Sequence, residues 1–401
     1  MRLLALLQEF PFPPNNGMRS DISRRLAAMH ALGHEVHAIS WTGGRLDPVL
    51  GEAELAQARM LTASLEVLPV ERGPRRVANM LRFPSQVAGR WPSPHSRAAL
   101  LVRIRALAPD AVWVDGVHAG ALGRWLATKL GVPLLYRSHN IEHRYLMEQT
   151  RLATGKNRVL IGANVLGMKR FERALLREAT MFFDISADDL DYWRGTGLTN
   201  GKWLPPLADP TILAVADVLD SSRTVDLLFL GSLSSPNNIK GVNWYLTHIH
   251  PLVVAALPDV TLIIAGRRPG APLAKRLATL GIPLVADPPE AAALFAMARV
   301  MLNPILHGSG MNIKTVDMLA TGCPVVTTPK GARGLPIDVV AQLIVAEDPA
   351  AFAEATVAAV IQARIGSAGT NRAGLMQRVF GHAALTQAFC ALPPIEIQDN
   401  G

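Results

Sequence analysis

A glycine loop runs directly into a predicted helix in the stretch GSGMNIKTVD, which begins at Gly308. A P-loop would need glycine where Ile313 stands, and a β-branched side chain at that position argues against this motif. Gly308 and Gly310 still allow the backbone to approach a ligand closely. The backbone amides at Met311 and Asn312, where the helix begins, can then face a diphosphate with the positive end of the helix dipole behind them.

Two charged side chains follow on this predicted helix. Lys314 and Asp317 are three residues apart, so they share one face. A lysine can neutralise phosphate, and a carboxylate can accept hydrogen bonds from both hydroxyls of a ribose. A plain turn followed by solvated charges is the alternative, but the buried strand and second glycine loop in TGCPVVTTPKGARGL favour a ligand site. The helix therefore predicts a sugar-nucleotide site.

The strands that must position these residues follow a parallel α/β pattern in both halves of the chain. In the first half we predict strands at RLLALLQ, HEVHAIS, DAVWVDG, VPLLYRS and MFFDIS, with a first helix over residues 18–32. In the second half we predict strands at DLLFLGS, VTLIIAG, IPLVA, VMLNPIL and CPVVTT, with a helix over residues 238–257. The fold class is therefore α/β, with two Rossmann-like domains facing across a cleft.

The composition limits the class of protein. The chain has 401 residues, enough for two domains, and its two cysteines, Cys323 and Cys390, offer no disulfide framework, so we expect a reduced, cytoplasmic protein. The first apolar run is broken by Gln8 and Glu9 and predicts a buried strand, and no transmembrane helix is expected. The net charge of +8 favours an anionic partner. Aromatic residues make up only 5% of the chain, which argues against a nucleic-acid-binding protein.

An arginine-rich segment over residues 72–107 mixes basic side chains with tryptophan, phenylalanine, leucine and valine. Such a segment can lie on an anionic membrane, which would place the protein at the inner face of the membrane. A solvated helix pair that covers the core is the alternative.

The first half of the chain also contains a short acidic motif that could be a metal site. Asp189 and Asp191 form a D-x-D pattern, which can bind a metal ion. However, Ser186 is a predicted N-cap, and Asp189 then lies in the first helical turn, where negative charge is favoured for structural reasons. No histidine or cysteine spacing suggests zinc, so we expect no metal site and no cofactor.

The sequence resembles glycosyltransferase family 4 (group 1), whose members have the two-domain GT-B fold. The resemblance rests on GSGMNIKTVD and TGCPVVTTPKGARGL, and it is supported by FPFPPNNGMRSDISRRLAAMHALGHEVHAIS, YRSHNIEHRY and LLFLGSLSSPNNIKGVNWYL. The resemblance implies a retaining transfer of sugar from a UDP-, GDP- or related nucleotide sugar to a glycan or lipid-linked acceptor, in bacterial polysaccharide or glycoconjugate biosynthesis. It also implies an acceptor-binding domain at residues 1–205, a donor-binding domain at 206–370, and a C-terminal helix over 371–401 that crosses back to the first domain. The connection near residues 204–223 joins the two.

The resemblance also implies roles for residues of the donor-binding domain. Many members carry two glutamates eight residues apart, where this chain has Ser309 and Asp317. Many also carry an arginine after the glycine that ends the first strand of this domain; here Gly231 is followed by Ser232, while Lys240 keeps the position of the partner lysine. Phosphate charge would then rest on Lys240, on Lys314 and on backbone amides, and the two lysines are the predicted catalytic cations.

The candidate residues of the first domain follow predicted strands. His118 comes after VWVDG and is expected to be catalytic, by bonding the acceptor or the transferred sugar, with a merely solvated histidine as the alternative. His139, Asn140 and Glu142 come after VPLLYRS and are expected either to bind the acceptor or to brace a loop. Gly17 is expected to let the first loop approach the phosphates of the sugar donor, with a plain glycine at a helix start as the alternative.

Three other functions stay open at this level. A sugar-nucleotide epimerase can have a GT-B-like fold and would need no acceptor. A non-catalytic homologue would explain Ser232 and Ser309. A nucleic-acid-binding protein would show strongly salt-dependent oligonucleotide binding.

Overall fold

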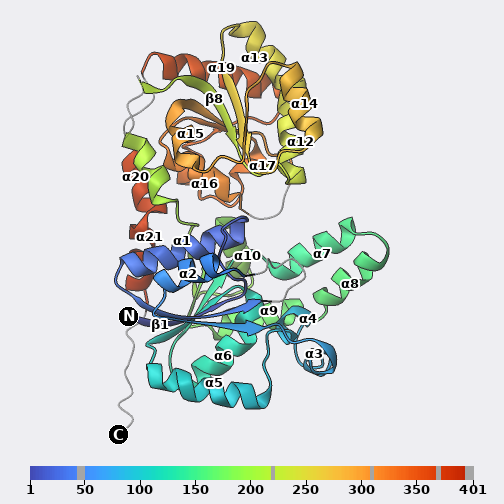
Figure 1. The fold of residues 1–401 in the computed structure, drawn as a ribbon, viewed down its shortest axis with the longest axis vertical. Helices are drawn as coiled ribbons and strands as arrows, with labels where there is room; N and C mark the ends of the chain where they lie inside the picture. Colours follow the sequence, from blue (N-terminus) through green and yellow to red (C-terminus); the bar gives the residue numbers. More distant parts are fainter. Residues whose placement is uncertain (43–49, 218–221, 308–310, 367–371, 393–401) are drawn as a thin grey trace. The chain divides into compact units, whose positions relative to one another are not determined.

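The computed structural model describes residues 1–42, 50–217, 222–307, 311–366 and 372–392. These residues form two compact units (Figure 1). Unit 1 consists of Met1–Pro205 with the chain from Leu385 onward, and unit 2 consists of Pro206–Ala384.

Unit 1 is built on a parallel sheet with the strand order β3-β2-β1-β4-β5-β6-β7. In the described residues the strands are β1 (Arg2–Leu7), β2 (Glu35–Thr42), β3 (Ser64–Pro69), β4 (Ala111–Asp115), β5 (Leu134–Ser138), β6 (Met181–Asp184) and β7 (Gly201–Trp203). The apolar run of β1 pairs with β2 on one side and β4 on the other, and it is buried from Leu3 to Leu7. Such uniform burial is typical of a parallel sheet covered on both faces.

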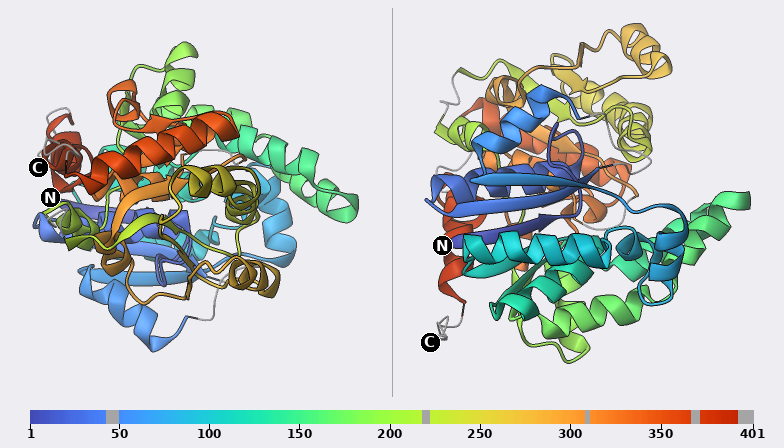
Figure 2. Two further views of the ribbon diagram at one scale, coloured as in Figure 1. Left: turned by 90° about the horizontal axis from the view of Figure 1, so that it is seen from above. Right: turned by 60° about the horizontal axis from the view of Figure 1, so that its bottom comes forward.

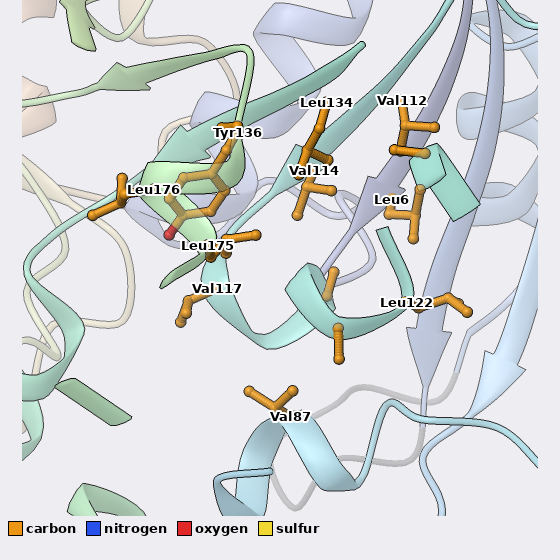
Figure 3. Close-up of a cluster of buried hydrophobic side chains, with 14 of the residues drawn as sticks. Leu6, Val87, Val112, Val114, Val117, Leu122, Leu134, Tyr136, Leu175 and Leu176 are labelled. Carbon is orange, nitrogen blue, oxygen red and sulfur yellow. The ribbon is translucent and has the colours of Figure 1, made fainter. Parts of the chain in front are cut away.

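Helices cover this sheet on both faces (Figures 1 and 2). The described helices of unit 1 are α1 (Gly17–Ala31), α2 (Glu52–Met60), α3 (Gly73–Met80), α4 (Ser85–Ala88), α5 (Pro94–Leu107), the 3₁₀ turn η1 (Val117–Ala119), α6 (Gly120–Leu130), α7 (Glu142–Leu152), α8 (Gly155–Val165), α9 (Met168–Glu178) and α10 (Ala187–Gly195). In the core, Val114 and Tyr136 of the sheet meet Leu122 of α6 and Leu175 of α9 (Figure 3). A Cβ at Gly123 would lie 2.1 Å from a methyl of Val114, so glycine lets α6 pack closely on β4.

Unit 2 repeats the pattern with a parallel sheet of order β10-β9-β8-β11-β12-β13. The strands are β8 (Val225–Leu230), β9 (Leu262–Gly266), β10 (Leu284–Ala286), β11 (Ala298–Asn303), β12 (Val325–Thr327) and β13 (Ile344–Val345). The described helices are α11 (Pro210–Leu213), η2 (Ala214–Asp217), α12 (Pro236–Trp244), α13 (His250–Ala256), α14 (Ala271–Thr279), α15 (Ala291–Met297), α16 (Ile313–Ala320), α17 (Pro329–Ala332), α18 (Ile337–Val340), α19 (Pro349–Arg364), α20 (Arg372–Phe380) and α21 (His382–Cys390), the last of which ends in unit 1.

Two predicted helices are interrupted. The helix expected over residues 238–257 is divided by a π-helical turn at Tyr245–Ile249, because Pro251 has no amide proton to continue the α-helical ladder. The C-terminal stretch is two helices that meet at Gly381, where a Cβ would lie 2.3 Å from the carbonyl oxygen of Gln377.

The C-terminal segment contacts each unit separately. In unit 2, the carbonyl of Phe380 accepts a hydrogen bond of 2.9 Å from the amide of Ala208. In unit 1, the ring of Phe389 packs edge-on against Trp113, with 6.0 Å between centroids, and against His34 at 4.8 Å. In the described part of the predicted connection near 204–223, Ile212 of α11 is buried in unit 2.

No helix in the described parts of the chain is long and apolar enough to cross a membrane.

Candidate functional site

The predicted glycine loop joins a buried strand to a helix, as its sequence indicated. Strand β11 ends at Asn303 and α16 begins at Ile313. Asn312 is the N-cap residue, and its carbonyl accepts a hydrogen bond of 2.9 Å from the amide of Thr315. Met311 and Asn312 are both half-buried. The predicted site residues Gly308, Ser309 and Gly310 lie outside the described residues.

A buried hydrogen-bond network connects the start of α16 to the sheet. The Nδ2 of Asn303 donates hydrogen bonds to the Oγ1 atoms of Thr315, at 2.9 Å, and Thr327, at 3.1 Å. Thr315 in turn donates to the carbonyl of Gly331 at 2.9 Å, in the second glycine loop. Sequence reasoning missed these residues, because single polar residues inside apolar strands and helices carry no pattern. Their bonds hold α16 and the two strand ends in a fixed arrangement.

Lys314 is the unusual cation of this helix. Its half-buried side chain donates a hydrogen bond of 2.8 Å to the Oδ1 of Asn238, and its Nζ lies 4.4 Å from the centroid of the Phe229 ring. None of the described carboxylates forms an ion pair with it. Desolvation by burial lowers the pKa of Lys314 to about 7. An ammonium in such surroundings is well suited to bind an anion, because an anion would restore the charge compensation that burial removes.

Asn238 links Lys314 to the loop after β8. Its Nδ2 donates a hydrogen bond of 2.9 Å to the carbonyl of Ser232, whose Oγ lies 3.0 Å from that of Ser234. A Cβ at Gly231 would lie 3.1 Å from the same Nδ2. The predicted residues Gly231, Ser232 and Lys314 are therefore brought together by Asn238, a residue that the sequence analysis did not single out.

Two further residues of the predicted nucleotide site differ in their exposure. Asp317 is half-buried, one turn beyond Lys314 on α16, as the spacing predicted. Lys240 lies on α12 with its side chain exposed to solvent. Exposure makes Lys240 a weaker candidate than Lys314 for compensating phosphate charge, since water screens an exposed ion pair.

Three of the predicted residues of unit 1 form a cluster at the carboxyl ends of β4 and β5. The Nε2 of His118 lies 3.4 Å from the Oε1 of Glu142, and the Nδ2 of Asn140 donates to the Oε2 of Glu142 at 3.1 Å. The amide of His118 donates to the Oε1 of Gln8 at 3.2 Å. Gly116 has φ 90°, and a Cβ there would lie 2.1 Å from Gln8, so this glycine admits Gln8 to the cluster.

Glu172 of α9 holds the backbone of Glu142 in place. Its carboxylate accepts hydrogen bonds from the amides of Glu142, at 2.7 Å, and His143, at 3.3 Å, and lies 2.6 Å from the Nδ1 of His143. Burial raises the pKa of Glu172, although the bonds from His143 and from the Glu142 amide oppose this shift. Glu172 therefore caps α7, and the sequence contains no local signal for it because the two segments are 30 residues apart.

His139 belongs to a different arrangement, a buried ion network. Its Nε2 lies 2.6 Å from the Oδ1 of Asp115 and its Nδ1 lies 3.5 Å from Asp21. Arg25 bonds both aspartates, Asp21 at 2.8 Å and Asp115 at 2.6 Å, and Arg137 bonds Asp21 at 3.2 Å. Both ring nitrogens of His139 thus face carboxylates of the network, whereas the Nε2 of His118 has no hydrogen-bond partner among the described residues.

The charges of this network compensate one another. Burial by itself would raise the pKa of Asp115, but Arg25 and His139 outweigh burial and hold that pKa well below its usual range. The same balance, with Arg137 as the main cation, lowers the pKa of Asp21. The indole Nε1 of Trp113 donates a further bond of 3.2 Å to Asp115. The network therefore ties α1 to β4 and β5 under the strand ends that carry His118 and Glu142.

Asp184, at the end of β6, is buried with its carboxyl close to another acid. Burial and the neighbouring Asp189 raise the pKa of Asp184 to about 8. Its Oδ1 accepts a hydrogen bond of 3.0 Å from the amide of Ser186.

The D-x-D motif next to Asp184 has the geometry of a helix start. The side chain of Ser186 accepts a hydrogen bond from the amide of Asp189, as predicted for an N-cap, while Asp191 is exposed and pairs with Arg194 at 3.2 Å.

Gly17 is the first residue of α1 and is exposed. The preceding Asn16 caps this helix by accepting a hydrogen bond of 2.9 Å from the amide of Arg19.

Among the described residues, no group of three or more histidine, cysteine or acidic side chains is placed to hold a metal ion.

Two family models match the chain, one for each unit. The model described as "Glycosyl transferase 4-like domain" matches residues 16–205, and the model described as "Glycosyl transferases group 1" matches residues 224–361. The chain is also 26% identical over 372 residues to the "Uncharacterized 44.6 kDa protein in cps region" of Klebsiella pneumoniae, covering 88% of this chain and 89% of that protein.

Solved structures share the fold over nearly the whole chain. Anabaena HepE, solved in complex with UDP and glucose, is 14% identical with a TM-score of 0.58, and the likeness covers 97% of this chain and 98% of HepE. Sucrose-phosphate synthase from Thermosynechococcus elongatus is 15% identical with a TM-score of 0.62, again covering 97% and 98%. A glycosyltransferase from Rickettsia africae is 11% identical with a TM-score of 0.62, covering 97% and 96%. The predicted α/β fold class is confirmed.

Proposed function

The chain belongs to the group 1 glycosyltransferases, with a family 4-like N-terminal half and the GT-B fold, and from this premise we propose that it transfers a sugar from a nucleotide-diphosphate sugar to a glycan or lipid-linked acceptor. The transfer retains the configuration of the anomeric carbon. The sugar nucleotide is bound by unit 2 and the acceptor by unit 1. The sequence resemblance and the two family matches support each of these assignments.

The observation that carries the proposal is the state of Lys314. Among the described residues, the half-buried ammonium is hydrogen-bonded only to a neutral amide, and its pKa is lowered to about 7. Keeping this group charged therefore costs free energy in the protein without ligand. A diphosphate at the start of α16 would offset that cost, because both the ammonium and the helix amides favour negative charge there. As the glycosidic bond breaks, the leaving diphosphate gains charge, and the same groups would stabilise it.

UDP is the first nucleotide to test. HepE has been solved with UDP and with UDP-glucose, and it shares this fold, although its low identity to this chain does not transfer its ligand. The family resemblance supports a glycan or lipid-linked acceptor, and the chain is similar over 372 residues to a protein in the cps region of Klebsiella pneumoniae. We therefore place the reaction in bacterial polysaccharide or glycoconjugate assembly.

In unit 1 we assign the cluster of His118, Asn140 and Glu142 to the acceptor and the transferred sugar. These groups sit at strand ends, where ligands of parallel sheets bind. The Nε2 of His118 is buried, has no hydrogen-bond partner among the described residues and lies 3.4 Å from a carboxylate, so a hydroxyl that reached this cluster would supply the partner that the ring lacks. His139, by contrast, is assigned a positioning role within the buried ion network.

Calorimetric titration with UDP, in the absence of metal, tests the nucleotide site. Lys314→Ala should weaken UDP binding at least ten-fold, because a charge-assisted contact in a desolvated site is lost. Lys275→Ala is the matched control, since Lys275 is an exposed lysine of α14 in the same unit, and its affinity should equal that of the wild type. Equal affinity of Lys314→Ala and Lys275→Ala would remove Lys314 from the site.

The reaction itself separates this proposal from its alternatives. A glycosyltransferase releases UDP from a UDP-sugar in proportion to the acceptor supplied, and the anomeric configuration of the product, read by NMR, reports retention. Conversion of the sugar nucleotide to an isomer in the absence of acceptor would instead identify an epimerase. Tight UDP binding without turnover over a panel of acceptors would identify a non-catalytic homologue.

A further inference from the structure

The helical hairpin α7–α8 stands out from the sheet of unit 1 and turns back near Thr154 (Figure 1). Its tip, which we define as residues 151–159, reads RLATGKNRV and contains three cations and no acidic residue. Leu152 and Val159 both keep 73% of their surface exposed, one on each helix of the hairpin. Exposed large apolar side chains alternate with basic ones at this tip.

A second stretch of the same composition lies nearby. Residues 72–82 read RGPRRVANMLR and hold four arginines and no acidic residue. Their apolar side chains are also exposed, Val77 at 65% and Leu81 at 93%. The short helix α4 packs against both α3 and α8, which places the two stretches on one side of the unit, as Figure 2 also shows. We call the two stretches together the basic flank.

The basic flank is locally cationic, although it holds only seven of the 40 lysines and arginines of the chain. It carries seven cations and no anion, while the net charge of the whole chain is +8. Two glutamates border it: Glu71 pairs with Arg75 at 3.4 Å, and Glu148 is exposed on α7. The aromatic side chains of the arginine-rich segment belong to the fold: Trp91 is buried in the core with Arg97 stacked over its ring at 4.2 Å, and Phe83 packs against Trp91. The tryptophan and phenylalanine of that segment are therefore not the surface that the sequence analysis considered.

We propose that the basic flank binds an anionic lipid bilayer, with Leu152, Val159 and Leu81 entering the acyl boundary and the surrounding cations facing lipid phosphates. Single apolar side chains separated by basic ones suit the interface of a bilayer. An obligate protein interface would instead offer a contiguous apolar centre depleted of charge. This surface adds a partner to the proposed function, and its test contains no sugar nucleotide, so failure of one does not imply failure of the other.

Sedimentation of the full-length protein with sucrose-loaded vesicles tests the proposal. The vesicles are phosphatidylcholine alone, or phosphatidylcholine with an equal part of phosphatidylglycerol, at 50 mM and 500 mM salt. We expect binding to the anionic vesicles at low salt, weak binding to the neutral ones, and release by high salt as the charges are screened. Equal binding to both vesicle types, or none to either, would overturn the proposal.

Variants locate the contact. Replacing Arg151, Lys156 and Arg158 by glutamine should weaken partitioning about a hundred-fold, because each cation contributes about a factor of five at an anionic surface. Replacing Leu152 and Val159 by serine should weaken it at least five-fold without changing the charge. The matched controls are Arg105, Lys129 and Lys275 to glutamine, and Val102 and Leu280 to serine, all exposed and none of them part of the basic flank. Circular dichroism checks that every variant is folded.

Other occupants have distinct outcomes. If the wild type is a dimer in solution and the Leu152/Val159 variant is a monomer with unchanged vesicle binding, the flank is a self-association surface. If oligonucleotides compete with anionic vesicles and bind more tightly, the flank binds nucleic acid. Either result, or equal loss of vesicle binding in the control variants, would overturn the lipid proposal.

Discussion

The Nζ of Lys314 lies 2.8 Å from the Oδ1 of Asn238, and this bond joins the first turn of α16 to the first turn of α12. Asn238 also bonds the carbonyl of Ser232, so the loop after β8 and the helix after β11 share one polar contact. The two strands are neighbours in the sheet. The amine is thereby held where two helix N-termini meet, close to the carboxyl edge of the sheet, where parallel α/β domains bind ligands.

The affinity for UDP should fall as the pH rises above 7. In the free protein the pKa of Lys314 is lowered to about 7, so the amine loses its proton above that pH, whereas a bound diphosphate would favour the ammonium. Binding then takes up a proton, and the dissociation constant should rise by up to about ten-fold per pH unit between pH 7 and 9. Titration calorimetry over that range measures it. Lys314→Met should show a flat profile, and a flat profile in the wild type would contradict the assignment.

Removal of Glu172 should loosen the start of α7. Glu172→Ala leaves the buried amides of Glu142 and His143 without their acceptor, which should lower the free energy of unfolding by about 2–4 kcal/mol. Glu172→Gln keeps an acceptor oxygen and should lose less. Urea denaturation gives both values. Glu178→Ala on the same helix, where an exposed carboxylate pairs with Arg124 at 2.5 Å, should cost less than about 1 kcal/mol.

The same variant has a catalytic readout under the proposed function. Glu172→Ala should lower kcat through the displaced Glu142 and leave the dissociation constant of UDP unchanged, since the nucleotide is assigned to unit 2. Partial recovery of kcat in Glu172→Gln would follow the recovery of the cap. A loss of UDP affinity equal to the loss of kcat would instead point to general unfolding.

Replacing Asp184 by asparagine should stabilise the fold more as the pH rises from 5 to 8. The folded-state pKa of about 8 exceeds the unfolded value near 4, so the folded protein holds a proton that the unfolded chain releases over this range. That difference costs the wild type up to about 1.4 kcal/mol per pH unit, and a neutral amide does not bear the cost. Urea denaturation of both proteins at each pH gives the difference. A constant difference between pH 5 and pH 8 would contradict the raised pKa.

The buried ion network should tolerate loss of a partner poorly. Asp21→Asn leaves Arg25 and Arg137 with one carboxylate between them in the core, and we expect a loss of about 3–5 kcal/mol in the free energy of unfolding. Asp191→Asn, which breaks the exposed pair with Arg194, should cost less than about 1 kcal/mol. Thermal denaturation at pH 7 compares them. Equal melting temperatures for the two variants would show that the network contributes little.

Acid should destabilise unit 1 through the same network. The pKa values of Asp21 and Asp115 are lowered in the folded state, so their contribution is present above their unfolded values near 4 and is lost as the pH falls below that range. The change in stability between pH 5 and pH 3 should therefore be smaller in Asp21→Asn than in the wild type. Chemical denaturation at the two pH values measures both changes.

The sequence by itself determined the class of fold and most of its strands. Runs such as LLALL in β1 and LLFL in β8 are apolar without alternation, and this pattern is typical of a strand covered on both faces of a parallel sheet. The strands β3, β7 and β13 were missed, because β3 is half-buried at an edge and the other two are only three and two residues long. Short edge strands bury too few side chains to leave a periodic signal.

The sequence also determined the candidate nucleotide helix, since spacing along one helix is a local property. Lys314 and Asp317 could be paired from their numbers alone. Tertiary structure decided which of the lysines is desolvated: Lys314 lies against Phe229 and Asn238, whereas Lys240 is exposed. Burial depends on residues more than 70 positions away, so no local pattern could have shown it.

In unit 1 the division is sharper. The sequence placed His118, Asn140 and Glu142 at strand ends, but the partners that hold them come from distant segments, Gln8 from β1's end and Glu172 from α9. The sequence also grouped His139 with Asn140, whereas in the fold the side chain of His139 contacts Asp21 and Asp115 in the buried ion network. Neighbours in sequence share a backbone position, but only packing between distant elements decides which side chains become buried, and burial sets their charge and their chemistry.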